Sequence, residues 1–323
     1  MSAAEPVHPD GMGHRAHISS FMLAAALSAA AAPSPAGALK LEYLYDFATL
    51  GGKVRLGGLQ VAFDPAGNEI FATGYGAVRI FNTAGVQTFS FRTDYAAEGS
   101  LIGVAALADG DLFLLTRRND RGFGLFRANY RGEPVGEVVL SGIPAEIGAD
   151  FQPTEIAHAN GHVYLADQGQ MKVLVLDETG AFAASYDLAD MLGVAATRDD
   201  LGLSAFNVDR EGNLLFTIAP LFTAYVVSPD GAVKSFGKPG SAPGKFNILS
   251  GIASDDAGRL YVADSLKSAV LVFDRSFNFL GEFGYRGRAP GNLLRPRSLA
   301  AGNGRVYVAQ AGDRGVTVFR IDE

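Results

Sequence analysis

The sequence predicts an all-β fold, a six-bladed β-propeller of four-stranded antiparallel blades, on three observations. A motif of apolar residues around a glycine turn recurs six times. The copies begin near residues 61, 104, 156, 206, 252 and 299, so they lie 43 to 52 residues apart. Short strands joined by glycine turns at such a period are typical of propeller blades. A β-sandwich does not repeat one motif six times, and no copy has the 3.6-residue apolar period of a helical solenoid.

The clearest copy shows how one blade is built. It opens with GIASDDAGRLYVAD over residues 251–264 and continues with VLVFD over 270–274 and FLGEF over 279–283. The apolar opening, the two β-rich segments and the last segment give four strands, joined by the short glycine- and asparagine-containing turns of hairpins.

The two ends of the repeat region predict how the ring closes. The sixth copy supplies three strands, ends in VTVFR over residues 316–320, and has no outer strand after it. The missing strand is expected at the other end of the chain, where residues 41–47, LEYLYDF, precede the first copy. A strand borrowed from the N-terminal side would cover an exposed sheet edge. We therefore expect the N-terminal strand to complete the last blade.

The first 38 residues are typical of a secretory signal peptide. A basic stretch at 14–17 precedes an apolar run over 21–32, and the segment ends in AGA at 36–38. A short basic region, an apolar centre and a small-residue end form such a signal, and the run is shorter than the roughly 20 residues of a membrane-spanning helix. We expect cleavage near Ala38, export to the periplasm or the cell exterior, and no membrane insertion.

Two domain assignments follow. Residues 1–38 are assigned to the signal peptide and residues 39–323 to one propeller, which we expect to be a monomer. A start at Met12 instead of Met1 would leave residues 1–11 untranslated.

Composition narrows the function classes. The net charge of −7 argues against general nucleic-acid binding by the whole chain. The chain has no cysteine, which excludes disulfides, thiolate metal sites and thiol catalysis. No phosphate loop, dinucleotide fingerprint or nucleophile-elbow motif is present, and GFG at 122–124 is expected to be a flexible loop.

Several segments resemble the NHL repeat family. The strands YVAD at 261–264 and YLAD at 164–167, and the glycine-rich segments 237–246 and 284–293, match its usual form. The resemblance spans residues 41–323, strongly in blades 5 and 6 and weakly in blades 2 and 4. It implies a propeller that binds proteins, RNA or glycans, while some relatives on similar propellers are lyases or lactonases with a metal in the central channel. A repeat family specifies architecture better than activity.

Two aspartates end the YLAD and YVAD strands. We expect Asp167 and Asp264 to accept hydrogen bonds from the turns that follow them, as aspartate commonly does.

Four polar residues stand near the starts of the expected inner strands, where side chains face the channel: Gln60, Glu155, Asn207 and Ser298. A lactonase-type calcium site uses such oxygen ligands, but only Glu155 is charged, and blades 2 and 5 carry Gly103 and Gly251 at the corresponding positions. The sequence therefore predicts no metal at these residues.

Zinc chemistry is disfavoured for a similar reason. A zinc site needs several converging histidines, whereas beyond residue 38 only His158 and His162 occur, both expected in one hairpin turn. The sequence predicts no catalytic residue and no cofactor, and favours binding over catalysis. A metal-dependent hydrolase or lyase in the channel is the alternative.

Charge is sorted among the segments that join one blade to the next. Segments 47–60, 237–251 and 284–298 contain no acidic residue and eight basic ones: Lys53, Arg55, Lys238, Lys245, Arg286, Arg288, Arg295 and Arg297. Tyr285 lies among them. The other three junctions hold only Arg92 and Arg198 against nine acidic residues: Asp94, Glu98, Glu146, Asp150, Glu155, Asp187, Asp190, Asp199 and Asp200.

The junctions all emerge on one face of a propeller, so one half of that face is expected to be basic and the other acidic. Arginine clusters bind carboxylate, sulfate and phosphate groups. The sequence therefore predicts an exported binding or scaffold protein whose basic residues and Tyr285 contact an anionic protein or glycan. Nucleic acid is not expected, because the stacking aromatics of single-strand binders are missing.

Overall fold

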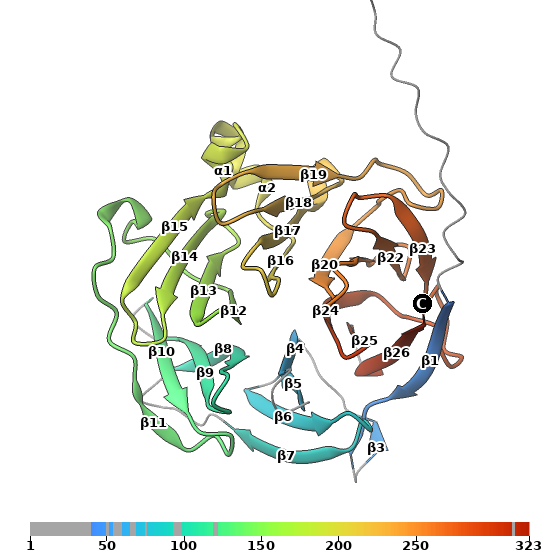
Figure 1. Cartoon of the computed structure of the whole chain (residues 1–323), viewed down its shortest axis with the longest axis horizontal. Coiled ribbons are helices and arrows are strands. Elements are labelled where there is room, and N and C mark those ends of the chain that lie inside the picture. Colours follow the sequence, from blue (N-terminus) through green and yellow to red (C-terminus); the bar gives the residue numbers. More distant parts are fainter. Residues whose placement is uncertain are drawn as a thin grey trace, which may run out of the picture. The chain divides into compact units, whose positions relative to one another are not determined.

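The computed structural model describes residues 40–49, 52–53, 60–64, 69–74, 76–92, 99–118, 122–311 and 314–322. These residues belong to one compact unit. The unit consists of six four-stranded antiparallel sheets arranged in a ring around a central channel (Figure 1). The predicted fold class is therefore confirmed. The predicted signal peptide, residues 1–38, lies outside the described residues.

Each of the first three blades is a run of four consecutive strands. Blade 1 consists of β4 (Gln60–Asp64), β5 (Glu69–Gly74), β6 (Ala77–Asn82) and β7 (Gln87–Arg92). Blade 2 consists of β8 (Ser100–Ala106), β9 (Leu112–Arg117), β10 (Phe123–Ala128) and β11 (Pro134–Glu137). Blade 3 consists of β12 (Glu155–Ala159), β13 (His162–Asp167), β14 (Lys172–Asp177) and β15 (Phe182–Asp187). The expectation of a flexible loop at 122–124 is wrong, because Phe123 and Gly124 begin β10.

Blades 4 and 5 follow the same order. Blade 4 consists of β16 (Ala205–Val208), β17 (Leu214–Ile218), β18 (Thr223–Val227) and β19 (Val233–Phe236). Blade 5 consists of β20 (Leu249–Ser254), β21 (Leu260–Asp264), β22 (Ala269–Phe273) and β23 (Phe279–Phe283). A short hairpin, β2 (Ala48–Thr49) and β3 (Gly52–Lys53), stands outside the blades.

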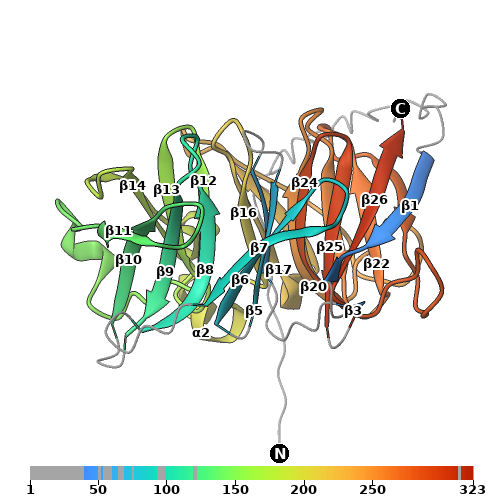
Figure 2. The same cartoon turned by 90° about the horizontal axis from the view of Figure 1, so that it is seen from below.

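Blade 6 closes the ring as the sequence predicts. Its strands β24 (Pro296–Gly302), β25 (Arg305–Gln310) and β26 (Val316–Asp322) are joined by β1 (Lys40–Asp46) as the outermost strand. The register pairs Leu41 with Ile321 and Tyr43 with Phe319. Figure 2 shows β1 lying alongside β26 at the rim.

The hydrophobic core is divided among the six junctions between blades. At the junction of blades 5 and 6, for example, Tyr261 and Val272 pack with Val308 and Phe319. Strands β21 and β22 are buried along their whole length, because both faces of a middle strand contact a neighbouring blade. Burial at every junction holds the sheets in a ring.

The aspartates of the YLAD and YVAD strands have a larger role than capping a turn. The Asp264 carboxylate accepts hydrogen bonds from the backbone N–H of Leu266 and Lys267 in the following turn, at 3.0 Å each. It also accepts one from Asn247 N–H, at 2.6 Å, in the segment that enters blade 5. Asp167 makes the same pair of contacts, with Gln170 and Gln152. The predicted turn contacts are confirmed, and each aspartate also fixes the preceding junction.

The junction between blades 3 and 4 contains short helices that the sequence analysis did not predict. They are α1 (Leu188–Met191), the 3-10 turn η2 (Ala195–Thr197) and α2 (Arg198–Leu201). Two further 3-10 turns are η1 (Ala145–Ile147) and η3 (Ala219–Leu221). Among the described residues, no helix is long and apolar enough to cross a bilayer.

Candidate functional sites: a basic surface and the central channel

The junctions that enter blades 5 and 6 have the same backbone structure. We call residues 237–248, which enter blade 5, and 284–297, which enter and begin blade 6, the basic connectors. In the first, Phe246 N–H donates to the Lys238 carbonyl at 2.8 Å; in the second, Leu293 N–H donates to the Tyr285 carbonyl at 2.9 Å. Because the four strands of each blade are antiparallel, these connectors and the other blade-to-blade junctions lie at the same end of the channel.

Buried anchors explain why the two connectors fold alike. Phe246 and Leu293 are both 0% exposed. The glycine that starts each connector packs against its anchor, since a Cβ on Gly237 would lie 2.4 Å from the Phe246 ring and one on Gly284 would lie 2.5 Å from Leu293. The φ angles of these glycines, 119° and 109°, are also accessible mainly to glycine.

Side-chain contacts complete the second connector. The Gln310 side chain accepts a hydrogen bond from Leu294 N–H at 2.6 Å, as Asp264 does from Asn247 in the first. The Arg314 guanidinium donates to the carbonyl oxygens of Arg288 and Asn292, at 3.2 and 2.9 Å. Arg314 was not predicted as a functional residue, because its position beside a strand carries no repeat signature. The connector backbones are thus held by internal contacts that use none of the predicted binding side chains.

The predicted binding side chains on the basic connectors point to solvent. All seven are exposed: Lys238, Lys245, Tyr285, Arg286, Arg288, Arg295 and Arg297. Within the described part of the chain, none of the six cationic side chains forms an ion pair or a side-chain hydrogen bond. The other two predicted cations are not described: Arg55 and the side chain of Lys53 lie outside the described residues.

In the junction between blades 3 and 4, the arginine forms its contacts within the junction itself and with blade 3. Arg198 donates to both carboxylate oxygens of Asp187 at 2.8 Å and to the Gln170 carbonyl at 2.7 Å, and it lies 3.6 Å from Asp190. Asp187 also accepts the N–H of Asp190 and so caps α1. The exposed acids Asp190, Asp199 and Asp200 remain at the surface, while Asp94 and Glu98 lie outside the described residues.

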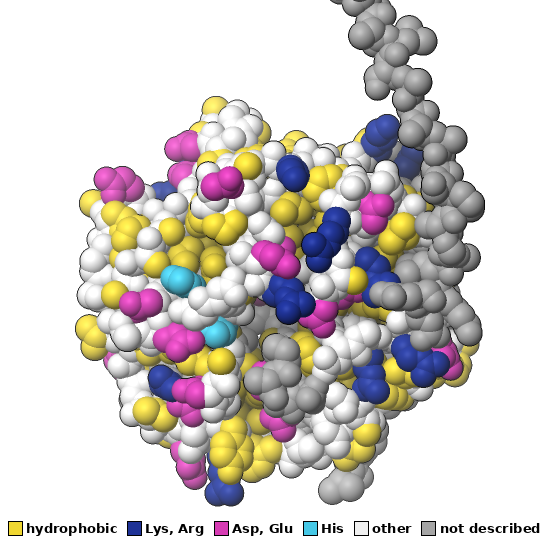
Figure 3. All heavy atoms as spheres, in the orientation of Figure 1, with side chains coloured by type: hydrophobic (Ala, Val, Ile, Leu, Met, Phe, Trp, Pro, Cys, Tyr) yellow, Lys and Arg dark blue, Asp and Glu magenta, His cyan; other side chains and the backbone are white. Residues whose placement is uncertain are grey.

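Charge is also sorted on the opposite face. Figure 3 shows the face carrying the two described histidines, which stand on either side of the turn in the first hairpin of blade 3 and so lie away from the connectors. Acidic side chains gather mainly over blades 2 to 4, and basic side chains mainly over blades 5 and 6. The electrostatic asymmetry is therefore a property of the two halves of the ring.

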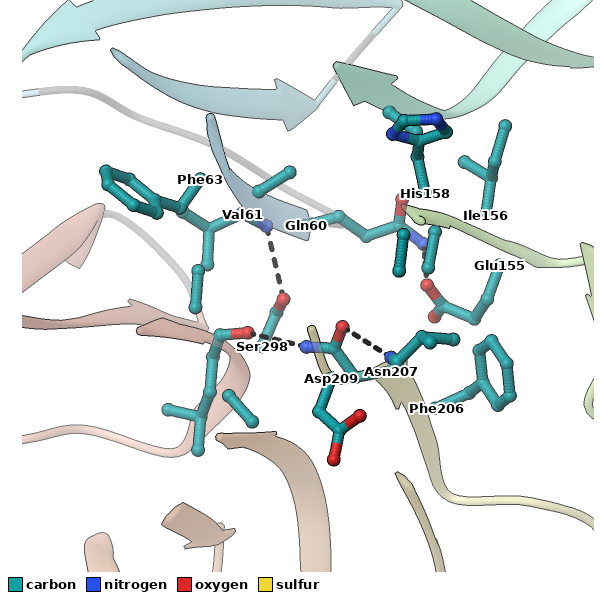
Figure 4. A pocket seen from close by; sticks show the side chains of 18 of the residues that line it. Gln60, Val61, Phe63, Glu155, Ile156, His158, Phe206, Asn207, Asp209 and Ser298 are labelled. Carbon is teal, nitrogen blue, oxygen red and sulfur yellow. Dashed lines mark hydrogen bonds between the residues drawn. The ribbon is translucent and has the colours of Figure 1, made fainter. Parts of the chain in front are cut away.

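The four predicted channel residues all line one cavity. This cavity, of ≈ 530 Å³, is enclosed by the inner strands of the six blades and includes Gln60, Glu155, Asn207 and Ser298 in its wall (Figure 4). Glu155, which the sequence analysis also counted with the acidic junctions, is thus a channel residue and not part of the outer face.

Two of these four side chains form hydrogen bonds between neighbouring blades. Ser298 Oγ, in blade 6, accepts the N–H of Val61 in blade 1 at 3.1 Å. Asn207, in blade 4, donates to the Ile252 carbonyl of blade 5 at 3.1 Å, and its oxygen accepts the N–H of Val208 at 2.8 Å. These polar groups satisfy buried backbone partners and so stabilise the ring.

The other two side chains belong to blades 1 and 3 and contact each other past blade 2, which lies between them. Gln60 of blade 1 donates through Nε2 to Glu155 Oε2 of blade 3 at 2.6 Å. Gly103 of blade 2 makes this contact possible, because a Cβ there would lie 2.7 Å from Gln60 Oε1 and 2.9 Å from Ile156. Burial raises the pKa of Glu155 to about 7, and the hydrogen bond from Gln60 opposes that shift.

The channel residues do not fit a divalent metal. Glu155 is the one carboxylate among the four, and the oxygens of Asn207 and Ser298 already accept backbone N–H groups on separate strands. In the described part of the chain, no group of three or more His, Asp and Glu side chains stands close enough together to hold an ion. A calcium or zinc site built on these residues is therefore not supported.

The histidines are placed differently from the prediction of a shared turn. His158 lies within β12 and His162 begins β13, with only Asn160 and Gly161 as the turn between these strands. His158 lines the channel, where its Nε2 is 2.8 Å from Glu178 Oε1. The expectation was wrong because the strand extends further towards the turn than the glycine signal indicated.

Comparison with solved structures supports the fold. A protein of unknown function from Bacteroides thetaiotaomicron aligns with a TM-score of 0.60 and 12% identity, covering 88% of this chain and 76% of the other. A streptogramin B lyase aligns with a TM-score of 0.54 and 12% identity, covering 88% and 97%. A nidogen/laminin complex contributes a chain with a TM-score of 0.52 and 16% identity, covering 77% and 84%.

These likenesses show the six-bladed propeller and nothing finer, because proteins on one fold perform unrelated functions. No protein-family model and no curated protein matches the sequence. The NHL assignment, the signal peptide and the binding role accordingly stay predictions.

Proposed function

We propose that this chain is an exported propeller of the NHL type that binds an anionic partner, a glycan or an acidic protein surface, through its basic connectors. The observation that carries the proposal is the contrast between a fixed backbone and free side chains. Six exposed cations stand on two connectors whose main chains are anchored by Phe246 and Leu293, and no described acid neutralises them.

Physical chemistry favours this use of the connectors. Holding the backbone in place lowers the entropy that a partner must overcome on binding. Arginine presents planar donors that match carboxylate, sulfate and phosphate groups in pairs. The acidic half of the ring would repel a misplaced anionic partner, so the same charge distribution also orients it.

Among the similar structures, propellers occur both in a binding complex and in an enzyme. One similar chain comes from a complex of nidogen with laminin, and another similar structure is a catalytically inactive virginiamycin B lyase from Staphylococcus aureus with quinupristin, at a TM-score of 0.53 and 16% identity. We favour binding because the four channel residues provide no converging set of ligands or catalytic groups. The basic connectors, by contrast, present six exposed cations that have no acidic partner among the described residues.

The test is retention on dextran sulfate and on immobilised polyglutamate. The full-length protein should bind despite its net charge of −7, and added salt should release it, because exposed charges are screened. Replacing Arg286, Arg288, Arg295 and Arg297 with serine should abolish retention.

The matched control changes exposed acids on the same face. Asp190, Asp199 and Asp200 should be replaced with asparagine, leaving Asp187 intact because it caps α1 and binds Arg198. Retention should be equal or stronger in this variant. Equal retention of the parent and the arginine variant would contradict the proposal.

A further inference from the structure

The central channel has the size and lining of a small-molecule site. Its ≈ 530 Å³ lies within the range of roughly 300–1,000 Å³ that ligand pockets occupy. Val61, Ile156 and Phe206 are among the apolar residues that line the cavity, and Ile156 and Phe206 lie on the same side of it as Glu155 (Figure 4). Gly103 lets Gln60 and Ile156 approach its backbone closely, since a Cβ there would lie 2.7 Å from Gln60 Oε1 and 2.9 Å from Ile156.

Glu155 is set apart from the other charged groups of this cavity. Gln60 donates to Oε2, and no described cation contributes to the pKa of the carboxyl, which burial alone raises. A partly buried carboxylate without a cationic partner carries a desolvation cost. A ligand that brought a positive charge to Glu155 would remove that cost.

The remaining charged side chains that line the cavity have partners or lie at its mouths. Asp255 accepts from Arg259 and Tyr261 at 2.7 Å each, Asp256 contacts Arg210 at 3.2 Å, and Glu178 contacts His158 at 2.8 Å. Asp209 accepts two backbone N–H groups of its own turn. Asp64 is buried and engaged, and Arg297 is exposed at the connector end.

We propose that the channel binds a small organic ligand that carries a protonated amine on an apolar body. The ammonium pairs with Glu155 and the amide oxygen of Gln60, and the apolar part packs against Ile156 and Phe206. An ammonium supplies the donors that both oxygens can accept, and the aromatic and aliphatic wall offers burial to a hydrocarbon group of the same ligand. Of the basic-connector residues, only Arg297 also lines this cavity.

The test uses 2-phenylethylamine as the probe, titrated into the full-length protein by calorimetry at pH 8. Binding should be detected for the amine and be at least tenfold weaker for 2-phenylethanol, which has the same body without the charge. Glu155→Gln, which keeps the shape and the hydrogen bond to Gln60, should weaken amine binding at least tenfold. Glu178→Gln, at another glutamate that lines the cavity, should leave it unchanged.

A pH series gives a second test of Glu155, and Glu155→Gln is its control because His158 also lines the cavity. With the pKa of Glu155 near 7, affinity should fall about tenfold from pH 8 to pH 6 as the carboxyl becomes protonated. This dependence should disappear in Glu155→Gln.

Three results would overturn the proposal. They are no binding of the amine, equal binding by Glu155→Gln, and loss of binding in Glu178→Gln alone. Competition by calcium would instead indicate a metal site and would also overturn it. A variant with Arg286, Arg288 and Arg295 replaced by serine and Arg297 retained should still bind the amine, because none of the three lines the cavity. Failure of the anion-binding proposal and failure of this one are therefore distinguishable.

Discussion

The basic connectors and the junction between blades 3 and 4 perform the same topological task by different physical means. The connectors hold their backbones with a buried Phe246 or Leu293 and with hydrogen bonds to Asp264 or Gln310, so their cations stay free. The blade 3–4 junction folds into short helices, and its arginine, Arg198, is used to hold the segment together. A charge is available to a partner only where apolar burial and backbone contacts have already stabilised the loop.

The largest effect should come from removing a connector anchor. Phe246→Ala deletes a fully buried ring that packs against Phe236 and Phe273, so the free energy of unfolding should fall by about 3–5 kcal/mol. Denaturant unfolding measures it. Lys245→Ser, one residue away and exposed, serves as the control and should change stability by less than about 0.5 kcal/mol. Equal losses would mean that the connector is not held by its anchor.

A second prediction concerns Glu155, which, unlike Asp187, has no cationic partner among the described residues. The folded-state pKa of Glu155, about 7, lies above its ordinary value of 4.5. Between pH 4.5 and 7 the unfolded chain therefore releases this proton while the folded chain keeps it, and folding loses stability as the pH rises.

Glu155→Gln removes that loss. Relative to the parent, the variant should gain up to about 3 kcal/mol of unfolding free energy between pH 4.5 and pH 8. Urea titrations of both proteins across this range provide the measurement. If the two proteins showed the same pH dependence, the pKa of Glu155 would not be raised in the folded chain, and this prediction would be wrong.

A smaller effect is expected at Arg198. Arg198→Ala removes the guanidinium that donates to the Asp187 carboxylate and the Gln170 carbonyl, which should cost about 1–3 kcal/mol of unfolding free energy. Arg288→Ala, on a basic connector, should cost less than about 0.5 kcal/mol, because its guanidinium has no partner in the described structure. Thermal and urea unfolding of the two variants compare them directly. If Arg288→Ala were the more harmful change, the contrast between the two kinds of junction would fail.

The smallest effect concerns the four arginines together. Replacing Arg286, Arg288, Arg295 and Arg297 with serine should shift the free energy of unfolding by no more than about 1 kcal/mol, since exposed charges contribute little to stability. Circular dichroism and urea unfolding check this. A large loss would mean that the arginines are structural, and loss of anion retention in that variant would then not report on binding.

How far the sequence could predict the site differs between the surface and the channel. The basic connectors were predictable because loop residues at a known topological position are exposed, and their charge can be read directly from the sequence. Gln60 and Glu155 could be placed in the channel from their positions near strand starts. Their contact could not be predicted, because it joins blades 1 and 3 across Gly103 and depends on the curvature of the ring.

The sequence by itself determined the number of blades, the strand that closes the ring and the sorting of charge between its halves. These properties follow from local patterns, namely strand period, turn glycines and loop composition, which act within a few tens of residues. Only the tertiary structure decided that Asp264 and Gln310 fix the connectors, that Arg198 is used by its own loop, and that His158 lies in a strand. It also decided that Glu155 lies in the channel with no cationic partner among the described residues. Such outcomes depend on which distant groups packing brings within hydrogen-bonding distance, and no local pattern carries that information.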